Sequence, residues 1–264
     1  MTQGMATAFA KIRLALRGHV TTHVGASLAQ AMQLLDTVIS RARAHAPFMC
    51  LQSIGSSDEL ARSLQEEMEA INSARRAYPN VLDSALKDQD AVQNVRNWLD
   101  VCERISEADP GCVLHFGCHG EDGTLCLEDK PHPNAFAEKI ARCQPKCVVL
   151  NACETRAFAT AVRKRCPEAV LIFWDSPVRT SVAVAFSGRF YRELCRLRAE
   201  GQTDARTYED ACSEARLYLH GNDMLRKKGA DQLVFWMPEA RTASLATHPF
   251  LIPYWVSSLP SIPK

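Results

Sequence analysis

A histidine and a cysteine each stand just after a short apolar run of the chain. His119 follows such a run within C-V-L-H-F-G-C-H-G, which starts at residue 112, and Cys153 follows another within K-C-V-V-L-N-A-C-E-T, which starts at residue 146. Each run has the length and composition of a buried β-strand. Because ligands and catalytic groups collect at the carboxyl ends of parallel strands, the two side chains are expected to meet at one edge of a sheet.

A histidine beside a cysteine is suited to nucleophilic chemistry. A thiol with an ordinary pKa of about 8.5 is mostly protonated at neutral pH, and a neighbouring imidazole can remove its proton or stabilise the thiolate. His119 would act as the base and then protonate a leaving amine, while Cys153 attacks a carbonyl carbon. Gly120 has no side chain, so its N–H can approach a developing oxyanion, together with the N–H of Cys153. The pattern therefore predicts a minimal cysteine peptidase site.

These residues also carry a resemblance to a known family. A strand ending in H-F-x-x-H-G, followed by one ending in N-A-C-E-T, resembles the CHAT-domain family of caspase-like cysteine peptidases, in the clan of caspases, metacaspases and separases. The resemblance puts the catalytic histidine on His119 and the nucleophile on Cys153. Residues 174–194 are similar to the family's next strand and its F-x-x-x-F-Y helix, and His248 with Pro249 is similar to its closing H-P segment.

The resemblance extends from about residue 47 to residue 197 and has one departure. Where an acidic residue is expected shortly after Val178, the chain has Thr180 and Ser181. The resemblance implies a cysteine endopeptidase that cleaves protein or peptide substrates through a thioester acyl-enzyme, with no metal or organic cofactor. Helical repeats often precede the peptidase in this family and are not visible here. The chain is therefore expected either to act alone or to depend on a separate regulatory or activator protein.

Composition excludes several partner classes. The chain has 264 residues and a net charge of +1, which predicts no strong attraction to nucleic acid or to acidic membranes. No run of 18 apolar residues is present, so no membrane-spanning helix is expected. Eleven cysteines spread along a chain without a recognisable signal peptide indicate free thiols in a reducing compartment, and a cytoplasmic location is expected.

The chain is expected to divide into a basic N-terminal segment, 1–26, and a caspase-like peptidase domain, 27–264. Residues 1–35 contain Lys11, Arg13 and Arg17 but no acidic residue. Such a composition is typical of mitochondrial or plastid transit peptides, but a plain amphipathic helix or a disordered segment is favoured, because the sequence shows no clear cleavage signal.

Apolar periodicity predicts alternating strands and helices. A helical pattern starts at Ser27 and is ended by Pro47, and a first strand is expected at 48–51. The next helix is expected to bury a stripe that includes Leu64 and Met68, with Glu67 facing water. A further helical face in the run 90–105 includes Leu99. The remaining elements are expected at 79–86 (extended), 121–127 (hairpin), 131–142 (helix), 146–150 (strand), 155–166 (helix), 169–174 (strand), 180–198 and 204–220 (helices) and 233–236 (strand).

This alternation predicts an α/β fold with a mostly parallel sheet flanked by helices on both faces. The helix at 155–166 would then direct the positive end of its dipole towards Cys153, which can stabilise a thiolate by up to about 1 kcal/mol.

Two acidic residues are candidates for substrate binding. Asp175 ends the strand next to the one that carries Cys153. In the clan that the chain resembles, the pocket for the residue before the scissile bond is built near such a position, so Asp175 could select Lys or Arg there. It could equally be a helix N-cap or part of a surface salt bridge. Glu154 follows the nucleophile and could contribute to specificity, although an unpaired carboxylate there would raise the pKa of the thiol. His119 or Arg156 is expected to offset it.

Two other kinds of protein are compatible with the same residues. The chain could be a non-catalytic scaffold that binds partner proteins, since a fold does not by itself imply an activity. It could also be a zinc-binding regulatory domain, although the spacing of the candidate ligands is irregular and strand alternation sends neighbours to opposite faces. His115 in particular is expected to be a buried core histidine. The candidate zinc ligands are Cys112, His115, Cys118, His119, Cys126, Cys143 and Cys147.

Overall fold

The computed structural model describes Gln33 and residues 46–53, 58–79, 81–84, 92–121, 124–225 and 232–238. Three features expected from the sequence lie outside these residues: the basic segment 1–26, all but Gln33 of the helix that starts at Ser27, and the pair His248 and Pro249.

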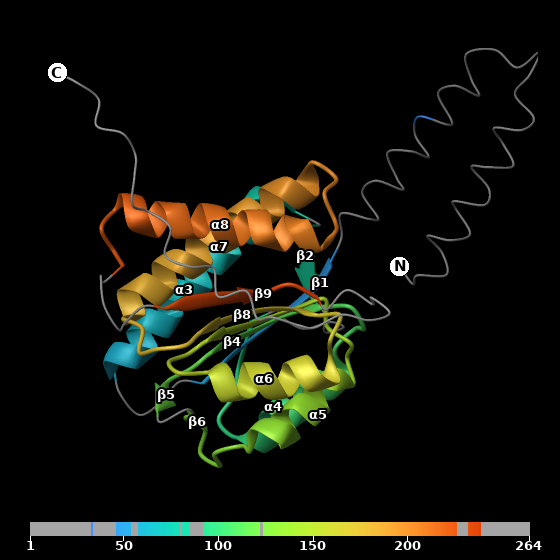
Figure 1. The fold of residues 1–264 in the computed structure, drawn as a ribbon, viewed down its shortest axis with the longest axis vertical. Coiled ribbons are helices and arrows are strands. Elements are labelled where there is room, and N and C mark those ends of the chain that lie inside the picture. The colour runs from blue at the N-terminus through green and yellow to red at the C-terminus, as the bar shows by residue number, and fades with distance from the viewer. Residues whose placement is uncertain are drawn as a thin grey trace, which may run out of the picture.

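The described residues form one seven-stranded sheet, in which the strands run parallel except for the last. The strand order is β2-β1-β4-β7-β8-β9, with β3 also pairing with β1, and β9 is antiparallel to β8 (Figure 1). This arrangement confirms the predicted α/β fold with a mostly parallel sheet. The strands are β1 (Ala46–Gln52), β2 (Leu82–Ser84), β3 (Val92–Asn94), β4 (Val113–Gly117), β7 (Cys147–Asn151), β8 (Val170–Trp174) and β9 (Leu233–Trp236).

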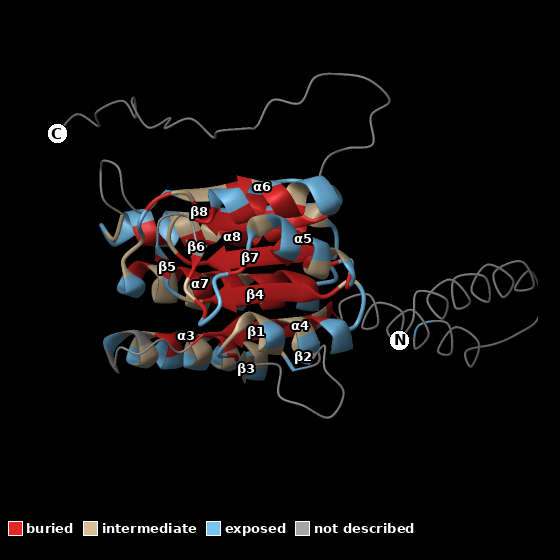
Figure 2. Ribbon diagram, turned by 90° about the horizontal axis from the view of Figure 1, so that it is seen from below, coloured by how far each residue is buried: buried red, intermediate tan, exposed pale blue. Residues whose placement is uncertain are grey.

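Helices cover both faces of this sheet, as the alternating pattern predicts (Figure 1). One layer contains α3 (Asp58–Ala77), α7 (Thr180–Ala199) and α8 (Ala205–Gly221), and the other contains α4 (Trp98–Glu107), α5 (Pro133–Ala141) and α6 (Arg156–Arg165). A separate apolar core fills the space between the sheet and each layer. Strands β4 and β7 are therefore buried on both faces, which explains their continuous apolar sequences (Figure 2).

The carboxyl ends of β4 and β7 lie level with each other. Gly117 and Asn151, the last residues of the two strands, are register partners. His119 and Cys153 each follow two residues later, so both belong to the same edge of the sheet. A short hairpin of β5 (Gly120–Glu121) and β6 (Thr124–Leu125) extends from this edge, and Leu125 anchors it in the core beneath α4, α5 and α6.

Two local predictions are wrong. Glu67 does not face water: it lies in the core with 2 % of its surface exposed, because it occupies the face of α3 that packs on the sheet and on α7. The run 90–105 is not one helix. It forms β3 and then α4, which starts where the Asn97 side chain accepts a hydrogen bond from the Asp100 N–H at 2.9 Å. Leu99 follows this cap on the outer side of α4 and is 63 % exposed.

Candidate active site

Cys153 lies in the turn that joins β7 to α6, and its side chain is partly exposed. Its sulfur contacts the backbone of Val178, just before α7. The Val178 N–H donates to Sγ at 3.3 Å, and Sγ also lies 3.6 Å from the Val178 carbonyl oxygen. The sulfur is thus held between the N–H and the carbonyl oxygen of Val178, and α6 begins only three residues after Cys153.

The turn after Cys153 is held tightly by β8. Glu154 has a φ of +54°, in the left-handed region that residues other than glycine rarely adopt. The Thr155 N–H donates to the Trp174 carbonyl oxygen at 2.9 Å, and its buried hydroxyl reaches the same oxygen at 3.2 Å. An unusual backbone conformation that the surrounding structure enforces is a feature of functional sites. Here it sets the direction in which Cys153 leaves the sheet.

Gly120 brings the histidine loop into contact with the cysteine loop. A Cβ built on Gly120 would lie 2.1 Å from the carbonyl oxygen of Cys153 and 2.8 Å from its nitrogen. Only a residue without a side chain can approach that backbone so closely. His119, the residue before it, is exposed at the surface. The structure thus brings the residue that follows His119 against the backbone of Cys153, at the carboxyl edge of the sheet.

The hairpin also contains Gly120, whose N–H is a predicted oxyanion donor. The Cys126 N–H donates to the His119 carbonyl oxygen at 2.9 Å, so Gly120 and Leu125 face each other as a non-hydrogen-bonded pair. Pairing within the hairpin therefore makes no use of the Gly120 N–H. Gly120 itself lies against the backbone of Cys153.

Replacing Gly120 by alanine is expected to disrupt this contact. The new methyl group would collide with backbone atoms of Cys153, which cannot move aside as a flexible side chain can. Overpacking of this kind lowers the free energy of unfolding by about 1–3 kcal/mol, and the displaced turn should slow alkylation of Cys153 about 100-fold. Urea unfolding and mass spectrometry of the alkylated thiol measure the two effects.

Gly221→Ala is the matched control, since among the described residues no atom lies within 4 Å of the Cβ it would add. Equal stability and equal alkylation rates in the Gly120→Ala variant and the wild type would show that the two loops do not make this contact.

Asp175, one of the two predicted substrate-binding residues, is engaged within the protein. Both of its carboxylate oxygens accept hydrogen bonds from the Arg156 guanidinium, which is the surface salt bridge that the sequence left open. The hydrogen bonds that Arg156 donates to Asp175 hold the pKa of Arg156 above its usual range. Asp175 is not a helix N-cap, because Arg179 occupies that position of α7. Glu154, the other candidate, is partly exposed beside Cys153, and Arg156 is committed to Asp175.

Two further thiols lie near Cys153. Burial raises the pKa of Cys118 above its usual range, and the nearby thiols of Cys126 and Cys153 add to this effect. Burial also raises the pKa of Cys126. Both thiols are therefore less prone to ionise at neutral pH than a free cysteine. All eleven cysteines are free thiols, as the composition predicts.

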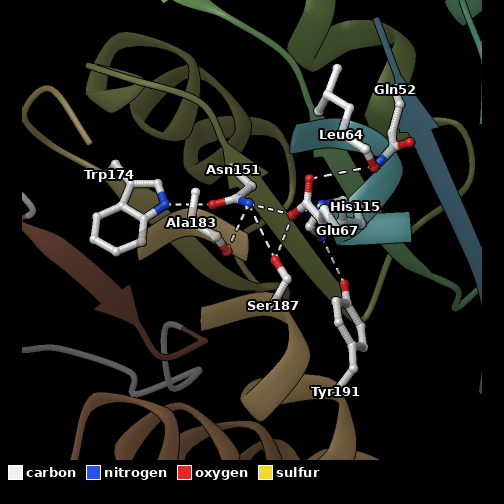
Figure 3. A network of polar contacts seen from close by, with 9 residues as sticks. All are labelled: Gln52, Leu64, Glu67, His115, Asn151, Trp174, Ala183, Ser187 and Tyr191. Carbon is white, nitrogen blue, oxygen red and sulfur yellow. Dashed lines mark hydrogen bonds and ion pairs between the residues drawn. The ribbon is translucent and has the colours of Figure 1, made fainter. Parts of the chain in front are cut away.

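A buried polar network lies beneath the site, and sequence reasoning missed its central residue (Figure 3). Glu67 of α3 accepts hydrogen bonds from Asn151 at the end of β7 and from Ser187 of α7. His115 of β4 is fully buried, as predicted, and its Nε2 lies 3.1 Å from the carboxylate, although off the line of a hydrogen bond. Its Nδ1 lies 3.1 Å from the Tyr191 hydroxyl.

The sequence contains a signal that would have placed Glu67 in the core. Leu64, Glu67, Ile71 and Ala74 are spaced by three, four and three residues, which is the spacing of one buried face of a helix. Met68 is apolar and is therefore expected on the buried face of this helix, but it is only partly buried. A carboxylate in an apolar stripe is a sign of a buried polar contact.

The residues proposed for zinc do not form a metal site in the described part of the chain. Within it, no three His, Cys, Asp or Glu side chains come together as a group that could hold a metal ion. Cys112 and Cys143 lie at the amino end of β4, whereas Cys118 and Cys126 lie beyond its carboxyl end. In the same part of the chain, no helix has the length and apolar character needed to cross a membrane.

The fold and the site together define an α/β protein with a histidine and a cysteine at the carboxyl edge of a parallel sheet. Comparison of the chain with protein-family models, with curated proteins and with solved structures finds no significant match.

Proposed function

We propose that the protein is a cysteine endopeptidase in which His119 and Cys153 form a catalytic dyad. The observation that carries the proposal is the close approach of Gly120 to the backbone of Cys153, which joins the two loops at the carboxyl edge of the sheet. The N–H of Val178 on the sulfur and the enforced turn at Glu154 add support. The resemblance of the two motifs to the CHAT-domain caspase-like peptidases points to the same chemistry.

The reaction begins with transfer of the thiol proton of Cys153 to the His119 imidazole. The sulfur then attacks the carbonyl carbon of the scissile peptide bond, and the carbonyl oxygen becomes an oxyanion. The N–H groups of Gly120 and Cys153 donate hydrogen bonds to that oxygen, which lowers the energy of the tetrahedral intermediate. His119 protonates the leaving amine as the carbon–nitrogen bond breaks, and a thioester to Cys153 remains.

Hydrolysis of the thioester completes the cycle. A water molecule loses a proton to His119 and attacks the thioester carbonyl, and the second tetrahedral intermediate releases a carboxylic acid and the thiol of Cys153. Every proton moves through His119, so the dyad is sufficient without a metal or an organic cofactor. Cys153 is partly exposed and His119 is exposed, which supports a reaction at the surface, where an extended segment of a protein substrate can bind.

Selective labelling of Cys153 tests the proposal. Peptides with an acyloxymethyl ketone warhead, carrying Arg, Lys, Asp, Asn or Leu next to it, are incubated with the protein, and the modified cysteine is identified by mass spectrometry. We expect labelling at Cys153 alone and its loss in the His119→Ala variant. Burial raises the pKa of most of the other thiols, among them Cys50, Cys147 and Cys212, and keeps them protonated and slow.

The residue preferred next to the warhead identifies the specificity of the site. A preference for Arg or Lys would require the Asp175 carboxylate to leave Arg156. Labelling spread over several cysteines, or Cys153 labelled at the same rate in the His119→Ala variant, contradicts the dyad. An absence of labelling, with and without added protein partners, would instead favour a non-catalytic scaffold.

A further inference from the structure

Three parallel strands end in one row beneath the candidate site. Gln52 of β1 is the register partner of Gly117 of β4, which in turn is the register partner of Asn151 of β7. His119 and Cys153 each lie two residues beyond this row. Any group that fixes the row therefore fixes the points from which both catalytic loops leave the sheet.

The Glu67 carboxylate lies against all three residues of the row, of which Figure 3 shows Gln52 and Asn151. Its Oε1 accepts from the Asn151 side-chain amide, and its Oε2 lies 3.5 Å from the amide nitrogen of Gln52, which also donates to the Leu64 carbonyl oxygen at 3.1 Å. A Cβ added to Gly117 would lie 2.8 Å from Oε2. Glycine at 117 thus makes room for the carboxylate over the middle strand.

Asn151 is held from its other side as well. Its side-chain oxygen accepts a hydrogen bond from the Trp174 indole N–H at 2.6 Å, and its amide lies 3.2 Å from the Ser187 hydroxyl. Ser187 itself donates to Glu67 at 2.6 Å. The amide of Asn151 is therefore fixed in one orientation by groups from α3, α7 and β8. Trp174 also provides the carbonyl oxygen that holds the turn after Cys153.

A carboxylate buried to this extent is costly unless its oxygens are paired, so its presence needs a reason. Apolar residues of similar volume usually stabilise a core at least as well as buried charges do. Glu67 lies at the junction of three strand ends, directly beneath the catalytic loops. This position indicates that it holds those strand ends in place.

We propose that Glu67 is a positioning residue, which acts through Asn151 and Gly117 to hold Cys153 and His119 in reactive geometry. The proposal rests on the function proposed above. Glu67 touches no reacting atom and supplies no proton. It ties the end of the cysteine strand to the end of the histidine strand, so that the two loops keep a fixed separation.

The test compares Glu67→Leu, Glu67→Gln and Gly117→Ala, whose new methyl group would displace the carboxylate. The rate constant kinact and the constant KI for Cys153 are measured with the preferred acyloxymethyl ketone peptide, well below the lowest Tm. We expect kinact to fall about 10- to 100-fold in Glu67→Leu and Gly117→Ala, with KI little changed. Glu67→Gln keeps an oxygen acceptor for Asn151 and should recover most of the loss.

Leu194→Ala is the matched control, because Leu194 is fully buried in the same layer on α7, two turns beyond Ser187. It should lower Tm but leave kinact unchanged. Unchanged kinact in both Glu67→Leu and Gly117→Ala, or an equal fall in Leu194→Ala, overturns the proposal. If Glu67→Leu does not fold, Gly117→Ala and Glu67→Gln decide the question.

Hydrogen exchange separates this inference from the proposed function. Faster amide exchange in peptides covering 118–121 and 152–156 is expected in Glu67→Leu and Gly117→Ala, but not in Leu194→Ala. This result stands even if wild-type Cys153 reacts with no peptide warhead, an outcome that would refute the peptidase function alone. Exchange that is equal in all variants would refute the positioning role.

Discussion

Replacement of Cys153 by alanine is expected to lower kcat/KM for a peptidyl amide substrate by at least about 10³-fold. Alanine cannot form the thioester, and burial raises the pKa of the neighbouring thiols, Cys118 and Cys126, so that neither replaces the nucleophile readily. His119→Ala should lower kcat/KM by about 10²- to 10³-fold, since a thiol remains but the base that activates it and the acid that protonates the leaving amine are lost. The substrate is the sequence preferred in the labelling experiment.

The matched control for this pair is Cys102→Ala. Cys102 is a partly exposed thiol like Cys153, but it lies on α4 and away from the carboxyl edge. Its removal should leave kcat/KM unchanged. Circular dichroism must show that each variant is folded, because only then does a loss of activity report on the chemistry. Full activity in a folded Cys153→Ala variant would exclude this residue as the nucleophile.

Alkaline pH is expected to unfold the protein, because several of its buried thiols ionise only after unfolding. Burial raises the pKa of Cys50, Cys147, Cys195 and Cys212 above the ordinary range of a thiol, in the last two to about 12. All four are at most 2 % exposed. Between pH 9 and the raised pKa, the unfolded chain has released these protons and the folded protein has not.

The sign of the effect follows from proton binding. Above pH 9 the unfolded state binds fewer protons than the folded state, so the free energy of unfolding decreases as the pH rises. Each such thiol contributes up to about 1.4 kcal/mol per pH unit, and the four together lower the free energy of unfolding by on the order of 5 kcal/mol between pH 8 and pH 10. A loss of that size is comparable with the whole stability of many domains.

Urea unfolding at a series of pH values, in the presence of a phosphine reductant, measures this dependence. Cys195→Ala and Cys212→Ala should each flatten the slope above pH 9, by about 1.4 kcal/mol per pH unit at most. Cys102→Ala should flatten it less, since that thiol is partly exposed. A free energy of unfolding that stays constant from pH 8 to pH 10 would contradict the expectation.

The strand ends of the candidate site could be predicted because their signals are local. A short apolar run followed by glycine, cysteine or histidine predicts a buried strand, even when the adjacent strands of the sheet are not known. The hairpin after Gly120 and the helices on either side of β8 follow from turn residues and from helical spacing in the same way. These elements are found where the sequence predicts them, within a few residues.

Contacts between distant segments could not be predicted in this way. Asp175 and Arg156 are 19 residues apart, and their pairing depends on the end of β8 lying beside the start of α6. The sequence therefore leaves Asp175 open between substrate binding, a helix N-cap and a surface salt bridge, and only the tertiary structure supplies Arg156 as its partner. The run 90–105 shows the same limit. Its apolar spacing fits a helix, and nothing in that spacing indicates that residues 92–94 pair with β1 as strand β3.

The sequence by itself determined the order of strands and helices apart from β3, and with it the edge of the sheet that carries His119 and Cys153. Only the tertiary structure decided which side chains pair with the polar residues beneath that edge. The spacing of α3 places Glu67 on a buried face, but its partners come from β1, β7 and α7. Burial is a property of the assembled layers, and helical spacing can show that a residue lies on a buried face but not what it binds there.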